Sequence, residues 1–173
     1  IIQGLLEFAR DREPQKVSAD INAIMETALG ILDNEFHLRH VGLELQLAGD
    51  MTKILLDENQ IEQVFINLLL NALHAVEENG CVTVKSAVDS KQKTVRVEIA
   101  DNGCGIAADD IEKIFEPFYS TKSKGTGLGL AVSYGIVQNH QGDIRVYSVP
   151  GEITRFTIEL PIWDENSSER RTP

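Results

Sequence analysis

The sequence has few cysteines, few basic residues and no long hydrophobic run, and each shortage excludes a class of protein. Its 173 residues include two cysteines, Cys81 and Cys104, which cannot build a disulfide framework, so a reducing cytoplasm is the expected location. The longest nearly apolar stretch, 64–76, is too short to span a membrane. No signal peptide is visible either, so we expect no direct membrane contact by this chain.

Positive charge is also scarce. Lysine and arginine number 16 against 27 aspartates and glutamates, which gives a net charge of -11. Nucleic acid and an anionic membrane surface both require a basic face, so neither is an expected partner. An acidic protein that binds a polyanion has to neutralise its charge locally, with backbone amides, a cation and a few placed lysines.

Hydrophobic periodicity predicts three long helices and about five strands. The helices are expected to begin near Ser18 or Asp20, near Asp57 and near Leu128, and Gly142 is expected to end the third. Alternating apolar residues predict strands at 41–47, 82–88, 95–100, 144–148 and 154–160. The elements do not alternate strictly, and the Rossmann and Walker A patterns are absent. We therefore expect an α/β fold, an α+β two-layer sandwich with three long helices on one face of a mixed sheet.

The two ends of the chain are expected to differ from its centre. Residues 1–13 have the pattern of a helix end followed by a polar linker, so the chain looks cut from a longer protein. Residues 14–162 form the expected domain, and the polar residues 163–173 are expected to be a flexible tail.

The second predicted helix carries a narrow polar stripe. Asn67, Asn71 and His74 are the only polar residues of 64–76 and fall within roughly 60° of one another on one helix face. The helix should be buried nearly all round, so the stripe must face polar partners or water. One interpretation is that it satisfies buried backbone groups. The other is that the asparagines hold a hydrated Mg²⁺ with His74 near phosphate.

Two glycine-rich segments flank a lysine-containing loop. Asp101-Asn-Gly-Cys-Gly105 directly follows an apolar strand; it is either a simple turn or a site where the carboxylate meets a purine amino group. Gly125-Thr-Gly-Leu-Gly-Leu130 opens the third helix, where backbone amides can bind an anion, and Lys122 and Lys124 precede it. Between them, the aromatic and proline cluster 115–119 is either a lid anchor or a small satellite core.

Together these motifs resemble the ATP-binding catalytic domain of sensor histidine kinases, within the GHKL group that also holds gyrase, Hsp90 and MutL ATPases. The four boxes of the family are matched in order by Asn67–Ala72 (N box), Asp101–Ile106 (first glycine box), Phe115–Phe118 (F box) and Gly125–Leu130 (second glycine box). Two weaker matches are His140-Gln-Gly142, with Gln141 in place of a glycine, and Thr154-Arg-Phe156, with Ile153 in place of a glycine. The match covers about residues 17–162, and the short segment 119–125 resembles the nitrogen-regulation and dicarboxylate-sensing branch.

The resemblance implies a nucleotide site under a lid at 107–126. Asn71 would hold Mg²⁺ with help from Asn67, and these two residues would be the catalytic ones. His74 and Lys122 would touch phosphates, and Asp101, with Thr154 and a water, would take the adenine amino group. The remaining positions implied to contact ATP or ADP are Ala75, Gly103, Gly105, Ile106, Phe115, Gly125, Thr126, Gly127, Leu128, Gly129 and Leu130.

The resemblance also implies a reaction and its partners. The domain would bind Mg-ATP and donate the γ-phosphoryl group to a histidine on a separate dimerisation domain, for relay to an aspartate of a response regulator. The parent would be a homodimer, with inner-membrane anchoring allowed, and this chain a monomer. Residues 1–10 would end the second helix of the dimerisation domain.

In such kinases the acceptor histidine lies on an exposed helix and is followed by an acidic residue. None of the four histidines of this chain is followed by an acidic residue. His37 and His40 precede leucine and valine, and His74 lies on the polar stripe. His140 is expected in the last turn of a helix, where a cation is favoured.

Two rival functions remain. An ATPase clamp of the same group would carry a glutamate at the first N-box position to activate water, whereas this chain has Asn67, which favours a kinase. A noncatalytic docking module would not need the intact metal asparagine Asn71 or both glycine boxes, so their presence argues against it.

Overall fold

The computed structural model describes residues 14–121 and 125–162. The expected helix end and linker (1–13), the expected tail (163–173), Lys122 and Lys124 lie outside the described residues. The strands are β1 (Val17–Ala19), β2 (Gly42–Gln46), β3 (Ile54–Leu56), β4 (Cys81–Asp89), β5 (Thr94–Asp101), β6 (Asp143–Val149) and β7 (Ile153–Pro161). The helices are α2 (Ile21–Leu38), α3 (Glu58–Ala75), α4 (Ala108–Ile111) and α5 (Gly129–Asn139).

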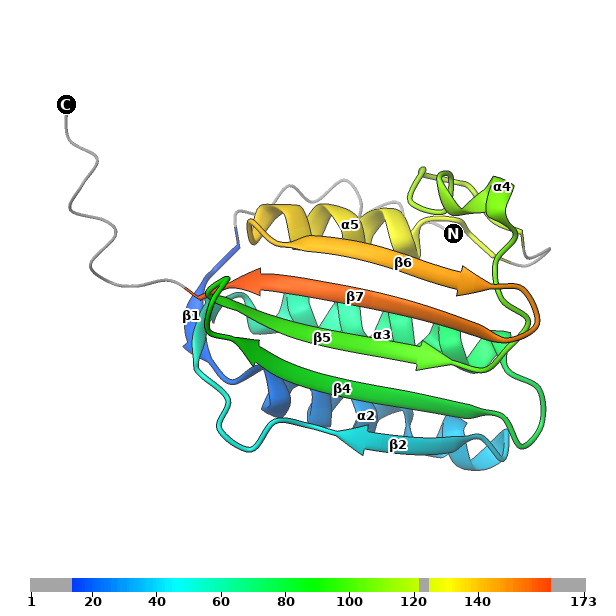
Figure 1. Cartoon of the computed structure of the whole chain (residues 1–173), viewed down its shortest axis with the longest axis horizontal. Coiled ribbons are helices and arrows are strands. Elements are labelled where there is room, and N and C mark those ends of the chain that lie inside the picture. The colour runs from blue at the N-terminus through cyan, green and yellow to red at the C-terminus, as the bar shows by residue number, and fades with distance from the viewer. Residues whose placement is uncertain (1–13, 122–124, 163–173) are drawn as a thin grey trace.

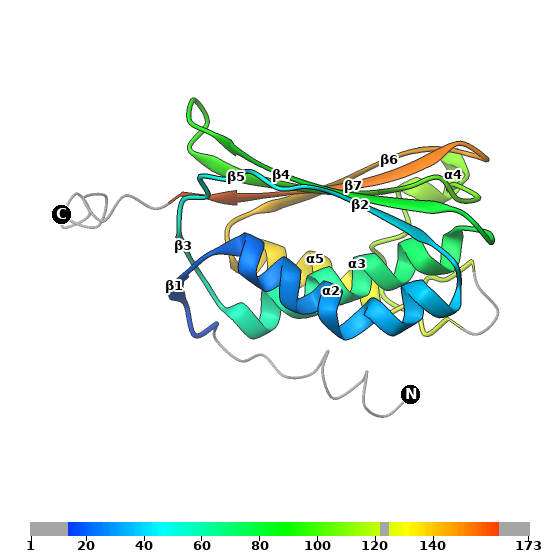
Figure 2. The same cartoon turned by 90° about the horizontal axis from the view of Figure 1, so that it is seen from below.

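A five-stranded sheet with the order β2-β4-β5-β7-β6 forms one layer (Figure 1). β2 pairs with β4 in parallel, whereas the other pairs are antiparallel. Helices α2, α3 and α5 form the second layer and cover one face of the sheet (Figure 2). The expected mixed sheet with three long helices on one face is therefore confirmed.

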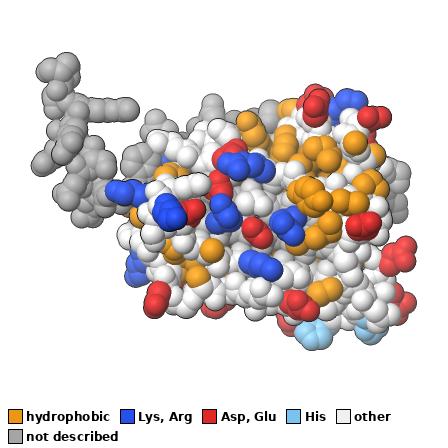
Figure 3. Space-filling view, viewed as in Figure 1, with side chains coloured by type: hydrophobic (Ala, Val, Ile, Leu, Met, Phe, Trp, Pro, Cys, Tyr) orange, Lys and Arg blue, Asp and Glu red, His pale blue; other side chains and the backbone are white. Residues whose placement is uncertain are grey.

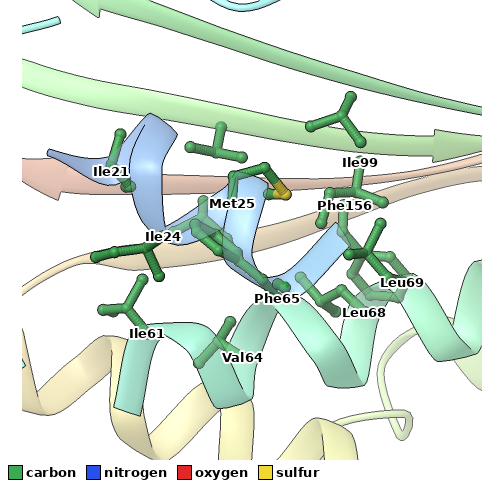
Figure 4. Close-up of a cluster of buried hydrophobic side chains, with 14 of the residues drawn as sticks. Ile21, Ile24, Met25, Ile61, Val64, Phe65, Leu68, Leu69, Ile99 and Phe156 are labelled. Atoms are coloured by element: carbon green, nitrogen blue, oxygen red, sulfur yellow. The ribbon is translucent and has the colours of Figure 1, made fainter. Parts of the chain in front are cut away.

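The core lies between these layers. On α3, Phe65, Leu68 and Leu69 have no exposed surface, and they meet inward residues of β5 and β7 such as Ile99 and Phe156 (Figure 4). Alternate residues of β5 are buried, as expected for a strand with one covered face. Burial of these side chains removes most apolar surface of α3 from water and fixes its position under the sheet.

The other face of the sheet carries charged side chains (Figure 3). Arg96 and Arg145 both pair with the carboxylate of Glu159, at 2.8 and 3.0 Å. Arg155 lies 4.0 Å from Glu98. None of the described helices is long and apolar enough to cross a membrane.

Three short elements were not predicted. β1 and β3 form a separate antiparallel pair, and α4 lies within the region expected to be a loop. Because Ser18 is part of β1, the cap of α2 is Asp20, whose side chain accepts a hydrogen bond from the backbone N–H of Asn22 at 2.8 Å. The first of the two suggested caps is thus wrong and the second correct.

The ends of α3 and α5 meet at a buried histidine. Asp57 caps α3 as predicted, accepting from the N–H of Gln60 at 3.1 Å. The N–H of Asp57 donates to Nε2 of His140 at 2.9 Å, and Nδ1 of His140 lies 2.8 Å from the carbonyl oxygen of Ile136. Burial lowers the pKa of His140 below its ordinary value. The expectation of a cation here is wrong, because the two hydrogen bonds require a neutral ring.

Helix α5 ends differently from the prediction. Gln141, not Gly142, adopts the left-handed conformation that reverses the chain, with φ at 58°. Gly142 is needed for space instead, since a Cβ there would lie 2.5 Å from the carbonyl oxygen of Glu159.

Candidate functional site

A cavity of about 450 Å³ opens where α3, the start of α5 and the end of β5 meet. This volume is within the range of small-molecule sites. Thirteen of the predicted site residues border it: Asn67, Asn71, His74, Ala75, Asp101, Gly105, Ile106, Gly125, Thr126, Gly127, Gly129, Leu130 and Thr154. Segments far apart in sequence therefore converge on one hollow.

The polar stripe of α3 faces this cavity. Asn67, Asn71 and His74 all border it, whereas the next positions on the helix, Leu68 and Leu69, are buried against the core. Half-buried carboxamides beside a cavity can offer carbonyl oxygens to a hard cation. The stripe also has a packing role, because the amide of Asn67 contacts α5 through two hydrogen bonds described below.

Asp101 is the last residue of β5 and one of the residues that line the cavity. Its side chain is 5% exposed, and its Oδ1 accepts from the N–H of Gly103 at 3.0 Å. Asp101 therefore does cap its own turn, as the simpler interpretation proposed. It also borders the cavity, beside its sheet partner Thr154, so both roles are compatible with its position.

A hydroxyl pair fixes Thr154. Ser148 Oγ donates to the carbonyl oxygen of Ile153 at 3.0 Å and accepts from the N–H of Ile106 at 2.8 Å. Thr154 Oγ1 lies 3.0 Å from Ser148 Oγ. Because the single hydroxyl hydrogen of Ser148 is already used, Thr154 must donate to Ser148. The Thr154 oxygen then keeps its acceptor capacity at the cavity.

Phe118 and Gly127 contact each other through their backbones, and we call this contact the neck. The N–H of Phe118 donates to the carbonyl oxygen of Gly127 at 2.9 Å. Gly127 has φ at 67°, and a Cβ on it would lie 2.4 Å from the carbonyl carbon of Phe118. Tyr119 is tied to the other wall by a 2.6 Å hydrogen bond from its hydroxyl to Asp110, which raises the pKa of Tyr119. The chain thus leaves and returns at one fixed point beside the cavity.

At two positions glycine is required because another part of the backbone lies close by, and not because a ligand needs the space. Gly105 has φ at 73°, and its missing Cβ would lie 2.6 Å from Cα of Pro150. At Gly103 a Cβ would lie 2.3 Å from the carbonyl oxygen of Ala75. These glycines let the turn after β5 pack against the β6–β7 turn and the end of α3.

Three predicted site residues do not border the cavity, namely Gly103, Phe115 and Leu128, and Lys122 lies outside the described residues. Phe115 supports the wall from behind. Its ring lies 5.5 Å from that of Tyr134 and 6.5 Å from that of Phe156, which does border the cavity. Leu128 is 5% exposed and precedes α5 as its cap residue.

Nine further residues border the cavity that were not named as site residues, six of them within the expected lid 107–126: Leu70, Cys104, Ala107, Asp110, Ile114, Tyr119, Ser120, Thr121 and Phe156. Helical spacing alone points to Leu70, because it lies three residues after Asn67 and four before His74. The position of Asp110 depends on its bond to Tyr119, for which the sequence has no signal.

Known proteins resemble both the sequence and the fold. Residues 56–164 match the family described as histidine kinase-, DNA gyrase B- and HSP90-like ATPase. The signal transduction histidine-protein kinase AtoS of Escherichia coli (strain K12) is 40% identical over 164 residues, which are 94% of this chain and 26% of AtoS. This chain therefore spans about a quarter of that relative.

Two solved structures share the architecture. The catalytic domain of the histidine kinase ThkA has a TM-score of 0.78 at 28% identity, covering 85% of this chain and 95% of that one. Full-length ShkA, solved in complex with AMPPNP, has a TM-score of 0.83 at 26% identity and covers 92% of this chain and 35% of ShkA.

Proposed function

Because the chain belongs to the histidine kinase-, DNA gyrase B- and HSP90-like ATPase family, we propose that it is the ATP-binding catalytic domain of a sensor histidine kinase. It binds Mg-ATP and donates the γ-phosphoryl group to a histidine on a separate dimerisation domain. A response regulator aspartate receives the phosphoryl group next. The parent is a homodimer whose catalytic domain acts in the cytoplasm.

The observation that carries this proposal is the cavity itself. The Asn67, Asn71 and His74 stripe borders it beside the start of α5, and Asp101 borders it at the end of β5. The N-terminus of α5 favours anions and has no side-chain cap hydrogen bond, and Gly127 and Gly129 carry no side chain there. Phosphates therefore belong near α5 and the stripe, and the base near Asp101 and Thr154.

The donor chemistry of the stripe suits Mg²⁺. Asn71 and Asn67 offer neutral carbonyl oxygens, and Mg²⁺ takes few protein ligands because it retains several waters. When bound, the metal neutralises charge on the phosphates. The protein's own contribution is to position the nucleotide and to exclude water from it.

Asn67 also bears on the choice between kinase and hydrolase. The amide cannot act as the general base that an ATPase clamp needs to activate water, since it does not accept a proton near neutral pH. We therefore expect the isolated chain to bind ATP and to hydrolyse it negligibly.

Two measurements test the proposal. Calorimetry with Mg-ATP should give a micromolar-range Kd, roughly 7–8 kcal/mol of binding free energy. Mixing the chain with Mg-ATP and a separately produced dimerisation domain of a related histidine kinase should then yield acid-labile phosphate on that domain. No binding at millimolar nucleotide would contradict ATP binding. Binding without any phosphohistidine would favour the docking-module alternative.

A further inference from the structure

Ser133 makes a closed set of hydrogen bonds with Asn67 and Gly129 where α5 crosses α3. Ser133 has no exposed surface, and its Oγ donates to the carbonyl oxygen of Gly129 at 2.9 Å. Nδ2 of Asn67 donates to the same carbonyl oxygen and to Oγ of Ser133, both at 3.3 Å. Asn67 borders the cavity, whereas Ser133 lies behind it.

Donor counting fixes the orientation of the Asn67 amide. Ser133 has one hydroxyl hydrogen, which it gives to Gly129. Both atoms that α5 presents to Asn67 are therefore acceptors, so the amide has to turn its NH₂ group toward them. The carbonyl Oδ1 of Asn67 then points away from these two acceptors of α5. In the reverse orientation the carbonyl oxygens of Asn67 and Gly129 would face each other at 3.3 Å, and the single Ser133 hydrogen could satisfy only one of them.

We propose that Ser133 is a positioning residue for metal binding: its hydroxyl holds the Asn67 amide so that the carbonyl oxygen, and not the NH₂ group, is available to the divalent cation. This inference rests on the proposed function, because it assumes that Mg-ATP occupies the cavity. Without the Ser133 acceptor, only the Gly129 carbonyl opposes rotation of the amide. A rotated amide would present donors to a cation, which repels them.

The alternative is that Ser133 is only a structural residue. Buried serines in helices often bond to the carbonyl oxygen four residues earlier, which satisfies the hydroxyl and nothing else. Under that alternative, removing the hydroxyl would change stability and leave the effect of Mg²⁺ on nucleotide binding unaltered. The two roles therefore predict different ratios of ATP affinity with and without Mg²⁺, and this ratio distinguishes them without a measurement of activity.

The test compares ATP affinity in Mg²⁺ and in EDTA by calorimetry, for wild type, Ser133→Ala and the control Gly135→Ala. Gly135 lies on the same helix with nothing within 4 Å of an added Cβ. We expect Ser133→Ala to bind ATP normally in EDTA and to lose about fivefold of the Mg²⁺-dependent gain, as for one hydrogen bond. Ser133→Cys keeps the size and a weak acceptor, so its loss should be smaller.

A spectroscopic readout accompanies the binding ratio. The side-chain NH₂ resonances of Asn67, identified by their absence in Asn67→Asp, should shift in Ser133→Ala without any ligand and stay unchanged in Gly135→Ala. An unchanged Mg²⁺ ratio in both Ser133 variants would overturn this inference alone. Failure of the wild type to bind ATP at all would overturn the proposed function, and this inference with it.

Discussion

The backbone N–H of Asp57 donates to Nε2 of His140 at 2.9 Å, across 83 positions of sequence. This bond joins the N-terminal cap of α3 to the C-terminal cap of α5, the two helices that border the cavity. The same Asp57 carboxylate accepts from the N–H of Gln15, and Nζ of Lys16 donates to the carbonyl oxygen of Asn139. The first described residues of the chain are therefore attached to both helices at once.

Stability should depend on the protonation of His140. A second proton on Nε2 would face the Asp57 N–H, and burial, with nearby Lys16, lowers the pKa of His140, although the Ile136 carbonyl and the Asp57 carboxylate act in the opposite direction. The unfolded chain, with a histidine pKa near 6.5, then binds the proton more readily than the folded chain. The free energy of unfolding is expected to fall as pH drops below about 6.5.

The pH effect is isolated with His140→Gln, whose side chain cannot titrate but retains a carbonyl acceptor for Asp57. Urea unfolding at pH 7.5 and pH 5.5 gives the free energy of unfolding for both proteins. The wild type should lose more than the variant on acidification. Equal losses would mean that His140 does not contribute to the pH dependence.

Asp101 is expected to select adenine over guanine. A carboxylate accepts a hydrogen bond from the adenine amino group, worth about 1.5–3 kcal/mol, whereas guanine presents a carbonyl oxygen at that ring position. Asp101→Asn keeps an oxygen for the Gly103 N–H and should weaken ATP binding by at least about tenfold. Calorimetry with ATP and GTP on the folded variant measures this. If the ratio of the two affinities does not change, Asp101 only caps its turn.

Asn71→Ala should separate metal function from nucleotide binding. The alanine leaves the apolar packing of α3 intact but removes a carbonyl oxygen from the cavity, so phosphoryl transfer should fall far more than ADP affinity. Gln138→Ala, an exposed amide on α5, is the control and should change neither. Parallel losses in transfer and in ADP affinity would argue against a metal role.

Gly127→Ala and the control Gly151→Ala test whether the close contact between Phe118 and Gly127 is needed for ATP binding. Both glycines have positive φ, at 67° and 75°, so each alanine costs about 1–2 kcal/mol in backbone strain. Only at Gly127 would the new Cβ also collide, with Phe118, and only Gly127 borders the cavity. Gly127→Ala should therefore lower both the melting temperature and ATP affinity, and Gly151→Ala the melting temperature alone. A normal ATP affinity in Gly127→Ala would contradict the importance of the neck.

The long elements were predictable because each has enough residues to show a period. The apolar stripe of α2 and the alternation in β5 are both buried as their patterns indicated. β1 and β3 have three residues each and depend on pairing with each other. Neither is long enough to show an alternation of apolar and polar residues in the sequence. Helix α4 was not predicted for the same reason, because its four residues are too few to show an amphipathic pattern.

The site was predictable where a residue's own neighbourhood in sequence carries its chemistry. The stripe on α3 is such a case, since three polar residues on one face of an apolar helix have to meet something polar. Ser133 is the opposite case, because it lies among apolar residues and acquires a role only through contact with Asn67. His140 was misjudged for a related reason: the burial that lowers its pKa and the Asp57 N–H that donates to its Nε2 both arise from the tertiary fold.

The described chain begins at the end of the helix layer remote from the cavity, next to β1, and α3 runs from there to the site (Figure 2). Asp57 and Asn71 are separated by about 21 Å along the axis of α3, at 1.5 Å per residue. Between these two points Phe65, Leu68 and Leu69 are fully buried against the sheet, so the helix spans this distance without freedom to tilt. One rigid helix therefore holds the attachment point of the first described residues and the metal-binding end of the cavity at a constant separation.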